Sequence, residues 1–64
     1  MKTLYDPAAD ALYVRFAEAE VIESEEVAPG FVLDYDSERR IVAVEVLDTR
    51  RHLARGAELP SAAE

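Results

Sequence analysis

Five aspartates are the residues of this sequence whose types and positions could do chemistry. Carboxylate oxygens bind Mg²⁺ and Ca²⁺, and two carboxylates held in a cleft can act as general acid and base. Two of the aspartates flank a Pro-Ala-Ala step in "YDPAAD", and two more stand in "DYDSERR". The five candidates are Asp6, Asp10, Asp34, Asp36 and Asp48.

The surroundings of most of these aspartates are those of turns and helix starts. The stretch "DPAADALYVRF" lacks the alternating acids and the central glycine of an EF-hand loop. Aspartate is frequent at chain reversals and at helix N-caps, because its carboxylate accepts hydrogen bonds from nearby backbone N–H groups. We therefore interpret Asp6, Asp10 and Asp36 as turn residues and Asp48 as a helix N-cap.

Asp34 differs because it stands inside the apolar run "FVLDYD". We expect it to face solvent or to pair with an arginine such as Arg15 across the sheet, and we favour both interpretations over a catalytic one. The sequence thus assigns no catalytic, cofactor-binding or metal-binding residue.

Other catalytic motifs are missing from the chain. There is no cysteine, and His52 is the only histidine, so one chain forms neither a thiolate site nor a two-histidine zinc site. Gly30 and Gly56 are the only glycines, which excludes the glycine-rich phosphate-binding motifs. We expect no enzyme activity and no cofactor.

The net charge of −7 is unevenly distributed. Residues 1–38 hold ten acids against two cations, whereas residues 39–64 hold four acids against five arginines. Such a body repels phosphates, so we expect no nucleic-acid binding over most of the surface and an attraction to a basic protein. Solubility alone is the simpler explanation of the charge. The tyrosines are then amphipathic residues of the sheet rather than base-stacking rings: Tyr5, Tyr13 and Tyr35.

Alternation of apolar and polar residues predicts that most of the chain is strand. Pro29-Gly30 suits a type II turn, and residues 18–26 are ambiguous between helix and strand, of which we favour strand. The clearest strands are residues 2–6, 11–16, 31–36 and 41–47.

The C-terminal part changes to a helical pattern. Asp48 precedes "TRRHLAR", and Gly56 is placed to end a helix of about two turns. Its arginines (Arg50, Arg51 and Arg55) are better explained as cations near a helix C-terminus than as a nucleic-acid contact. The sequence predicts an α+β fold, namely a small antiparallel β-meander of four to five strands with one short C-terminal helix. Residues 1–56 form the single domain, and residues 57–64 a disordered tail.

The strand "IVAVEVL" carries apolar groups on both faces. One short helix cannot cover both faces of a sheet, and a domain of 64 residues buries little surface by itself. We therefore expect a homodimer or an obligate partner that covers the second face. The sequence shows neither a signal-peptide pattern nor an apolar run long enough to cross a membrane, so we expect a cytoplasmic protein without a membrane partner.

With these stretches identified, the chain resembles a bacterial family of short proteins of unknown function, family DUF2283. The resemblance rests on "YDPAADALYVRF", "SEEVAPGFVLDYDSERRIVAVEVLD" and the helix start after Leu47, and it covers Met1 to about Ala54. The chain departs from the family at "SERR", where a glycine is expected near the end of the turn. The resemblance implies a β-meander with a C-terminal helix and no established activity. Some similar proteins look like antitoxin partners of small basic RelE-like toxins.

These observations favour a non-catalytic, acidic protein-interaction module, antitoxin-like towards a small basic partner. The alternative is a small metal- or ligand-binding enzyme that uses the aspartates at a dimer interface.

Overall fold

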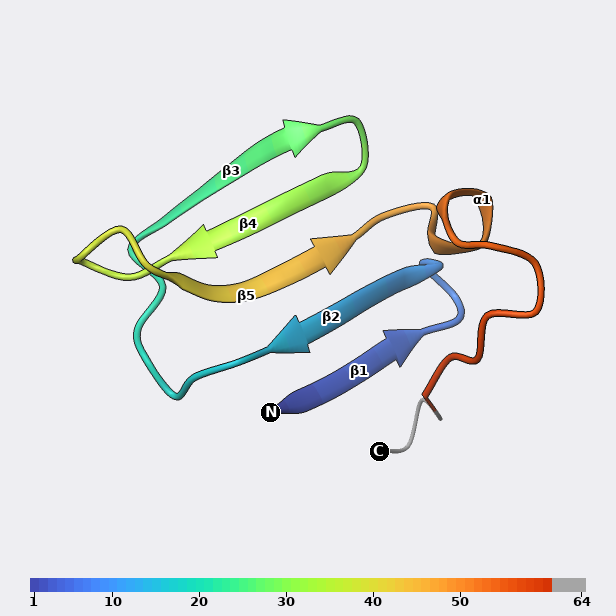
Figure 1. The fold of residues 1–64 in the computed structure, drawn as a ribbon, viewed down its shortest axis with the longest axis horizontal. Helices are drawn as coiled ribbons and strands as arrows, with labels where there is room; N and C mark the ends of the chain where they lie inside the picture. The colour runs from blue at the N-terminus through green and yellow to red at the C-terminus, as the bar shows by residue number, and fades with distance from the viewer. Residues whose placement is uncertain (61–64) are drawn as a thin grey trace.

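The computed structural model describes residues 1–60, which form one antiparallel sheet of five strands and a short helix (Figure 1). The predicted α+β class and the C-terminal position of the helix are confirmed. The strand prediction for residues 18–26 is confirmed only for residues 23–26, because residues 18–22 belong to an irregular connection. The elements are β1 (Lys2–Asp6), β2 (Ala11–Arg15), β3 (Glu23–Ala28), β4 (Phe31–Tyr35), β5 (Ile41–Val46) and α1 (Thr49–His52).

The strands lie in the order β1-β2-β5-β4-β3. A hairpin of β1 and β2 is joined to a meander of β3, β4 and β5, because β2 pairs with β5 rather than with β3. The connection between β2 and β3, residues 16–22, therefore passes the ends of the central strands to reach the far edge (Figure 1). Strand β5 is central, and β1 and β3 are the two edges.

The turns follow the local chemistry predicted for them. Asp6 Oδ1 accepts hydrogen bonds from the N–H groups of Ala8 and Ala9 at 3.0 and 3.4 Å. Asp36 Oδ1 accepts from the N–H groups of Glu38 and Arg40 at 2.8 and 2.9 Å. Asp6 and Asp36 are thus turn residues, as predicted.

Gly30 and Arg39 are turn residues with positive φ angles. At Gly30, φ is +85°, and a Cβ atom would lie 2.6 Å from His52 Cε1, so the turn after Pro29 requires glycine for two reasons. In the "SERR" turn, Arg39 has a φ of 62° at the place where a glycine is expected. Its side chain makes compensating contacts, since it pairs with Glu23 and lies 4.9 Å from the Tyr35 ring centroid.

The strand register divides the side chains of the sheet between two faces. Residues directly opposite each other in an antiparallel pair project to the same side, and Leu33 and Val14 both lie opposite Val44. We call this side the apolar face; its central residues are Leu12, Val14, Phe31, Leu33, Val44 and Val46. We call the other side the polar face; its central residues are Tyr13, Arg15, Ser24, Val32, Asp34, Ala43 and Glu45.

The core of this single-layer sheet is small. Among the described residues, the buried hydrophobic side chains are only Tyr5, Val42, Ala43 and Val46. Most other apolar residues of both faces are half-buried, which is the expected result of a sheet with no second layer.

Helix α1 is shorter than the predicted two turns. It ends at His52 because Leu53 takes an extended conformation, with φ −89° and ψ 155°. Gly56 has a φ of +83°, but it lies beyond the helix and does not terminate it. The predicted tail, residues 57–64, falls partly on residues 61–64, which are outside the described part, and residues 57–60 form no helix or strand.

The predicted capping by Asp48 is also wrong. Asp48 occupies the N-cap position, but in a left-handed conformation (φ 50°, ψ 50°) whose carboxylate makes no capping hydrogen bond to residues 49–52. Asp10, from the first hairpin, accepts hydrogen bonds at the start of the helix instead. Its carboxylate lies 3.3 Å from the N–H of Arg50, and its carbonyl oxygen accepts hydrogen bonds from the N–H and the hydroxyl of Thr49, each at 2.9 Å.

Thr49 should therefore be a stability determinant. It is fully buried, and its hydroxyl lies 2.9 Å from the carbonyl oxygens of Asp10 and Val46. Thr49→Val keeps the shape and removes the donor, and we expect a loss of about 1–2 kcal/mol in the free energy of unfolding. Urea unfolding at one fixed protein concentration measures it. Thr49→Ser keeps the hydroxyl and should recover most of the loss, whereas equal losses in the two variants would contradict a role for the hydrogen bonds.

Candidate functional site

The polar face carries the ionisable side chains that the sheet brings together. Ser24 lies opposite Asp34, and Asp34 lies opposite Ala43. Glu45, two residues further along β5, lies diagonally from Asp34 and directly opposite Tyr13. The register places these groups on one surface, because paired residues project to the same side and Ala43 and Glu45 are two residues apart along β5.

Asp34 is neither solvent-exposed nor paired with Arg15, so both expectations for it are wrong. Only 3% of its surface is exposed, and it is one of the buried polar residues of the described chain. The hydroxyl of Ser24 donates a hydrogen bond to Asp34 Oδ1 at 2.6 Å. A buried carboxylate requires such a donor, because loss of hydration is otherwise uncompensated.

The second partner of Asp34 is another carboxyl group, that of Glu45. A hydrogen bond with Asp34 raises the pKa of Glu45, and partial burial and the negative charge of Asp34 raise it further. Two neighbouring carboxyl groups cannot both ionise at low cost, which is the physical reason that the pKa of Glu45 is raised.

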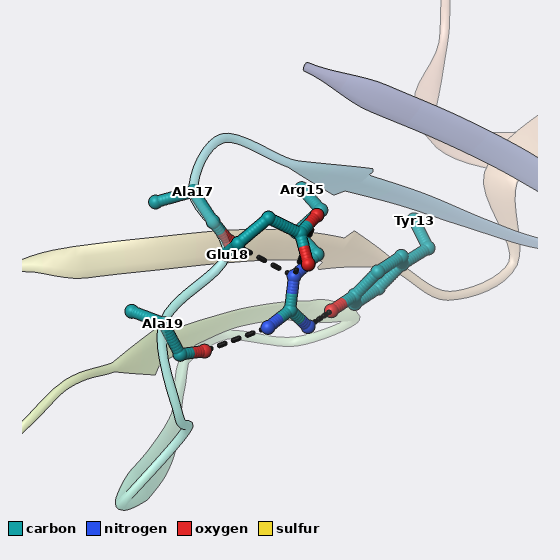
Figure 2. A network of polar contacts seen from close by, with 5 residues as sticks. All are labelled: Tyr13, Arg15, Ala17, Glu18 and Ala19. Atoms are coloured by element: carbon teal, nitrogen blue, oxygen red, sulfur yellow. Dashed lines mark hydrogen bonds and ion pairs between the residues drawn. The ribbon is translucent and has the colours of Figure 1, made fainter.

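Arg15 does not neutralise this pair because its guanidinium is engaged elsewhere (Figure 2). It donates to the carbonyl oxygens of Ala17 and Ala19 at 2.9 and 2.6 Å and to the hydroxyl of Tyr13 at 3.0 Å. Glu18 lies 4.0 Å away. Arg15 therefore holds the connection between β2 and β3 against the sheet, and this positioning role was missed in the sequence.

A second polar cluster lies at the end of the sheet next to α1. The Tyr5 hydroxyl donates to Asp10 Oδ1 at 2.6 Å, and the Arg50 guanidinium lies 5.9 Å from the Tyr5 ring centroid. This hydrogen bond lowers the pKa of Asp10 and raises the pKa of Tyr5. We predicted that Asp10 is only a turn residue. The structure shows that it also links the first hairpin to α1.

The five aspartates do not form one site. Asp10 lies near Thr49 at the α1 end of the sheet, whereas the turn at Asp36 lies at the opposite end (Figure 1). Within residues 1–60, no group of three histidine or carboxylate side chains is close enough together to hold a metal ion. His52 is a packing residue, since its ring lies 4.7 Å from that of Phe31 and its Nδ1 lies 2.9 Å from the carbonyl oxygen of Leu47.

The arginines near the C-terminus differ in their surroundings, although Arg50 and Arg55 line the same surface hollow. Arg50 lies over Tyr5, Arg51 is exposed at the end of α1, and Arg55 lies beyond the helix in the segment that follows it. Arg50 and Arg51 fall in the last turn of α1, where positive charge is favourable.

Comparison with known proteins identifies the family. The model of the family described as "Protein of unknown function (DUF2283)" matches residues 2–50, so the chain belongs to this family. No curated protein and no solved structure matches the chain. In the described residues, no helix is long and apolar enough to cross a membrane.

The carboxyl pair predicts a pH-dependent stability. Because the pKa of Glu45 is raised in the folded state, the folded protein binds this proton more tightly than the unfolded chain does. The resulting stabilisation is fully present below the ordinary value of 4.5 and is lost as the pH rises through the folded-state pKa. Glu45→Gln cannot ionise, so we expect it to be more stable than the wild type at neutral pH, by roughly 0.5 kcal/mol after solvent screening.

Urea unfolding of both proteins between about pH 4 and pH 8 measures this difference. The advantage of Glu45→Gln should grow with pH. Glu25→Gln, which removes one charge from exposed strand β3, is the matched control. If the difference in the free energy of unfolding between Glu45→Gln and the wild type stays constant over this pH range, the raised pKa of Glu45 is contradicted.

Proposed function

We propose that this member of the DUF2283 family is a non-catalytic protein-interaction module that binds a small basic protein. The observation that carries the proposal is the edge strand β3, Glu23–Ala28, in which all six residues are exposed and three are glutamates. An edge strand presents unpaired backbone N–H and C=O groups to solvent, so it is a natural place for another chain to bind.

The charge of this edge is only partly neutralised by the protein itself. Residues 1–60 contain three ion pairs: Arg15–Glu18, Arg39–Glu23 and Arg40–Glu38. Glu25 and Glu26 are in none of them. An uncompensated negative surface accelerates association with a positively charged protein and disfavours nucleic acids.

The same edge also exposes apolar side chains. Ile22, just before β3, is 57% exposed, and Val27 within it is 49% exposed. Apolar side chains surrounded by charge are the composition of a protein-binding surface, in which the apolar groups contribute affinity and the charges contribute orientation.

An antitoxin-like role is the specific form of this proposal. A protein that masks a small basic toxin needs an acidic surface, and the exposed glutamates of β3 supply one. This form rests on the resemblance of family members to such antitoxins, and it carries with it a cytoplasmic location. The placement of the aspartates in three separate parts of the sheet gives the alternative, a metal- or ligand-binding enzyme, no comparable support.

Edge protection is the competing explanation, because glutamates on an edge strand also prevent sheets from pairing with one another. The two explanations predict different effects of the same variant. Glu25→Gln/Glu26→Gln removes two negative charges while keeping an acceptor for the N–H of Gly30, which bonds Glu26 Oε2 at 3.0 Å.

We expect tagged wild-type protein to retain a small basic protein from a lysate of the native host, and the double variant to bind it at least ~10-fold more weakly, or about 1.4 kcal/mol. Titration of the purified partner at two salt concentrations measures the change. Glu38→Gln/Glu58→Gln removes the same charge away from β3 and should bind almost normally. If Glu25→Gln/Glu26→Gln associates with itself and still binds the basic protein as tightly as the wild type does, edge protection is the sole role of these glutamates.

A further inference from the structure

We propose that the apolar face of the sheet is covered by the same face of a second copy, giving a two-fold symmetric sandwich of two sheets. The proposal names the surface through which the chain associates with itself. It does not depend on the basic partner proposed above, because it concerns a different surface and the purified protein alone.

Val42 is buried near the start of β5, and at the opposite end of the sheet helix α1 covers the apolar face. Helix α1 reaches it there through Arg50, which lies over Tyr5, and through His52, whose ring packs on Phe31. The next row of side chains across the sheet, which we call the central row, has no such cover within residues 1–60. Its central members, Val14, Val44 and Leu33, are all half-buried although they stand on the three central strands.

The middle of this row carries no charge. Thr3 lies opposite Val14 on β1, and Glu25 lies opposite Leu33 on β3, so the one charged member of the row stands at the edge of the sheet. Two copies that each carry a net charge of −7 repel each other. A face whose central residues are uncharged is therefore the surface on which two copies can meet at the lowest electrostatic cost.

The polar face does not suit the same contact. Dimerisation through it would bury Glu45, which is only half-buried in the single chain, and removing a charged group from water costs more than its interactions return unless new partners satisfy it. The segment held by Arg15 also lies on this side (Figure 2). The two faces thus differ in what they can bind.

The size of the sheet is compatible with a stable dimer. The two longer extents of the molecule, 35 and 26 Å, give a projected face of roughly 900 Å², an upper limit close to the ~800 Å² per partner of a specific interface. Twisted sheets pack face to face with their strands about 30° apart and ~10 Å between sheets. A two-fold axis brings the same surface of both copies together, so that residue i of one copy meets residue j of the other and the reverse, and no second complementary surface is needed.

The oligomeric state of the purified wild type is the first test. Light scattering behind a sizing column should give twice the chain mass of 7.1 kDa at micromolar concentration. In a sample mixed from isotope-labelled and unlabelled chains, intermolecular NMR contacts should come from the methyl groups of Leu12, Val14, Leu33 and Val44. A monomer would overturn the proposal, and so would a dimer whose contacts come from Val32.

A pair of neighbouring substitutions gives a matched test. Leu33 and Val32 are adjacent in β4, both are half-buried, and they project to opposite faces. Leu33→Lys should be monomeric at a concentration where Val32→Lys is still a dimer, with circular dichroism as the check that each is folded. Dissociation of both variants, or of Val32→Lys alone, would count against the apolar face. If Leu33→Lys does not fold, the intermolecular NMR contacts of the wild type decide whether the apolar face forms the interface.

Discussion

The structure depends on the pairing of β5 with β2 on one side and β4 on the other. This strand connects the first hairpin to the β3–β4–β5 meander, and its alternating side chains contribute to both faces at once. Val44 and Val46 project to the apolar face, while Ala43 and Glu45 project to the polar face. Because the fold has one layer, a side chain that packs on one face does not stabilise the other. The apolar groups of one face and the charged groups of the other therefore need separate partners.

The polar face shows how little cationic charge is available to the sheet. Arg15 stands across Ala43 from Asp34, so a salt bridge between them looks plausible from the register alone. The backbone carbonyl groups of Ala17 and Ala19 take the guanidinium instead, because the chain must pass from β2 to the far edge at β3. The order of the strands thus determines the electrostatics, and Asp34 is left with a hydroxyl and a second carboxyl group as partners.

Local patterns were sufficient to predict most of the strands and the turns at Asp6, Asp36 and Gly30, since these depend on neighbours within a few residues. Asp10 was misassigned because its partner Thr49 lies 39 residues away in the chain. Asp34 was misassigned because Ser24 belongs to β3, whose conformation was ambiguous in the sequence. The length of α1 was overestimated for a related reason. Helical propensity continues past His52, but a short helix persists only where packing supports it.

The proposed self-association and the proposed partner binding involve a face and an edge of this sheet, and the geometry of a sandwich keeps them compatible. When two sheets pack through their faces, the edge strands of both remain at the margin, so strand β3 and its glutamates stay accessible in the dimer. The uncharged middle of the central row therefore suits self-association, whereas the charged edge suits binding of a basic protein. An acidic residue in the central row would oppose dimerisation, and an apolar, uncharged β3 would invite further sheets to add at the edge. In the proposed assembly, the uneven distribution of charge in this chain lets a second copy cover one face while one edge stays accessible to a basic partner.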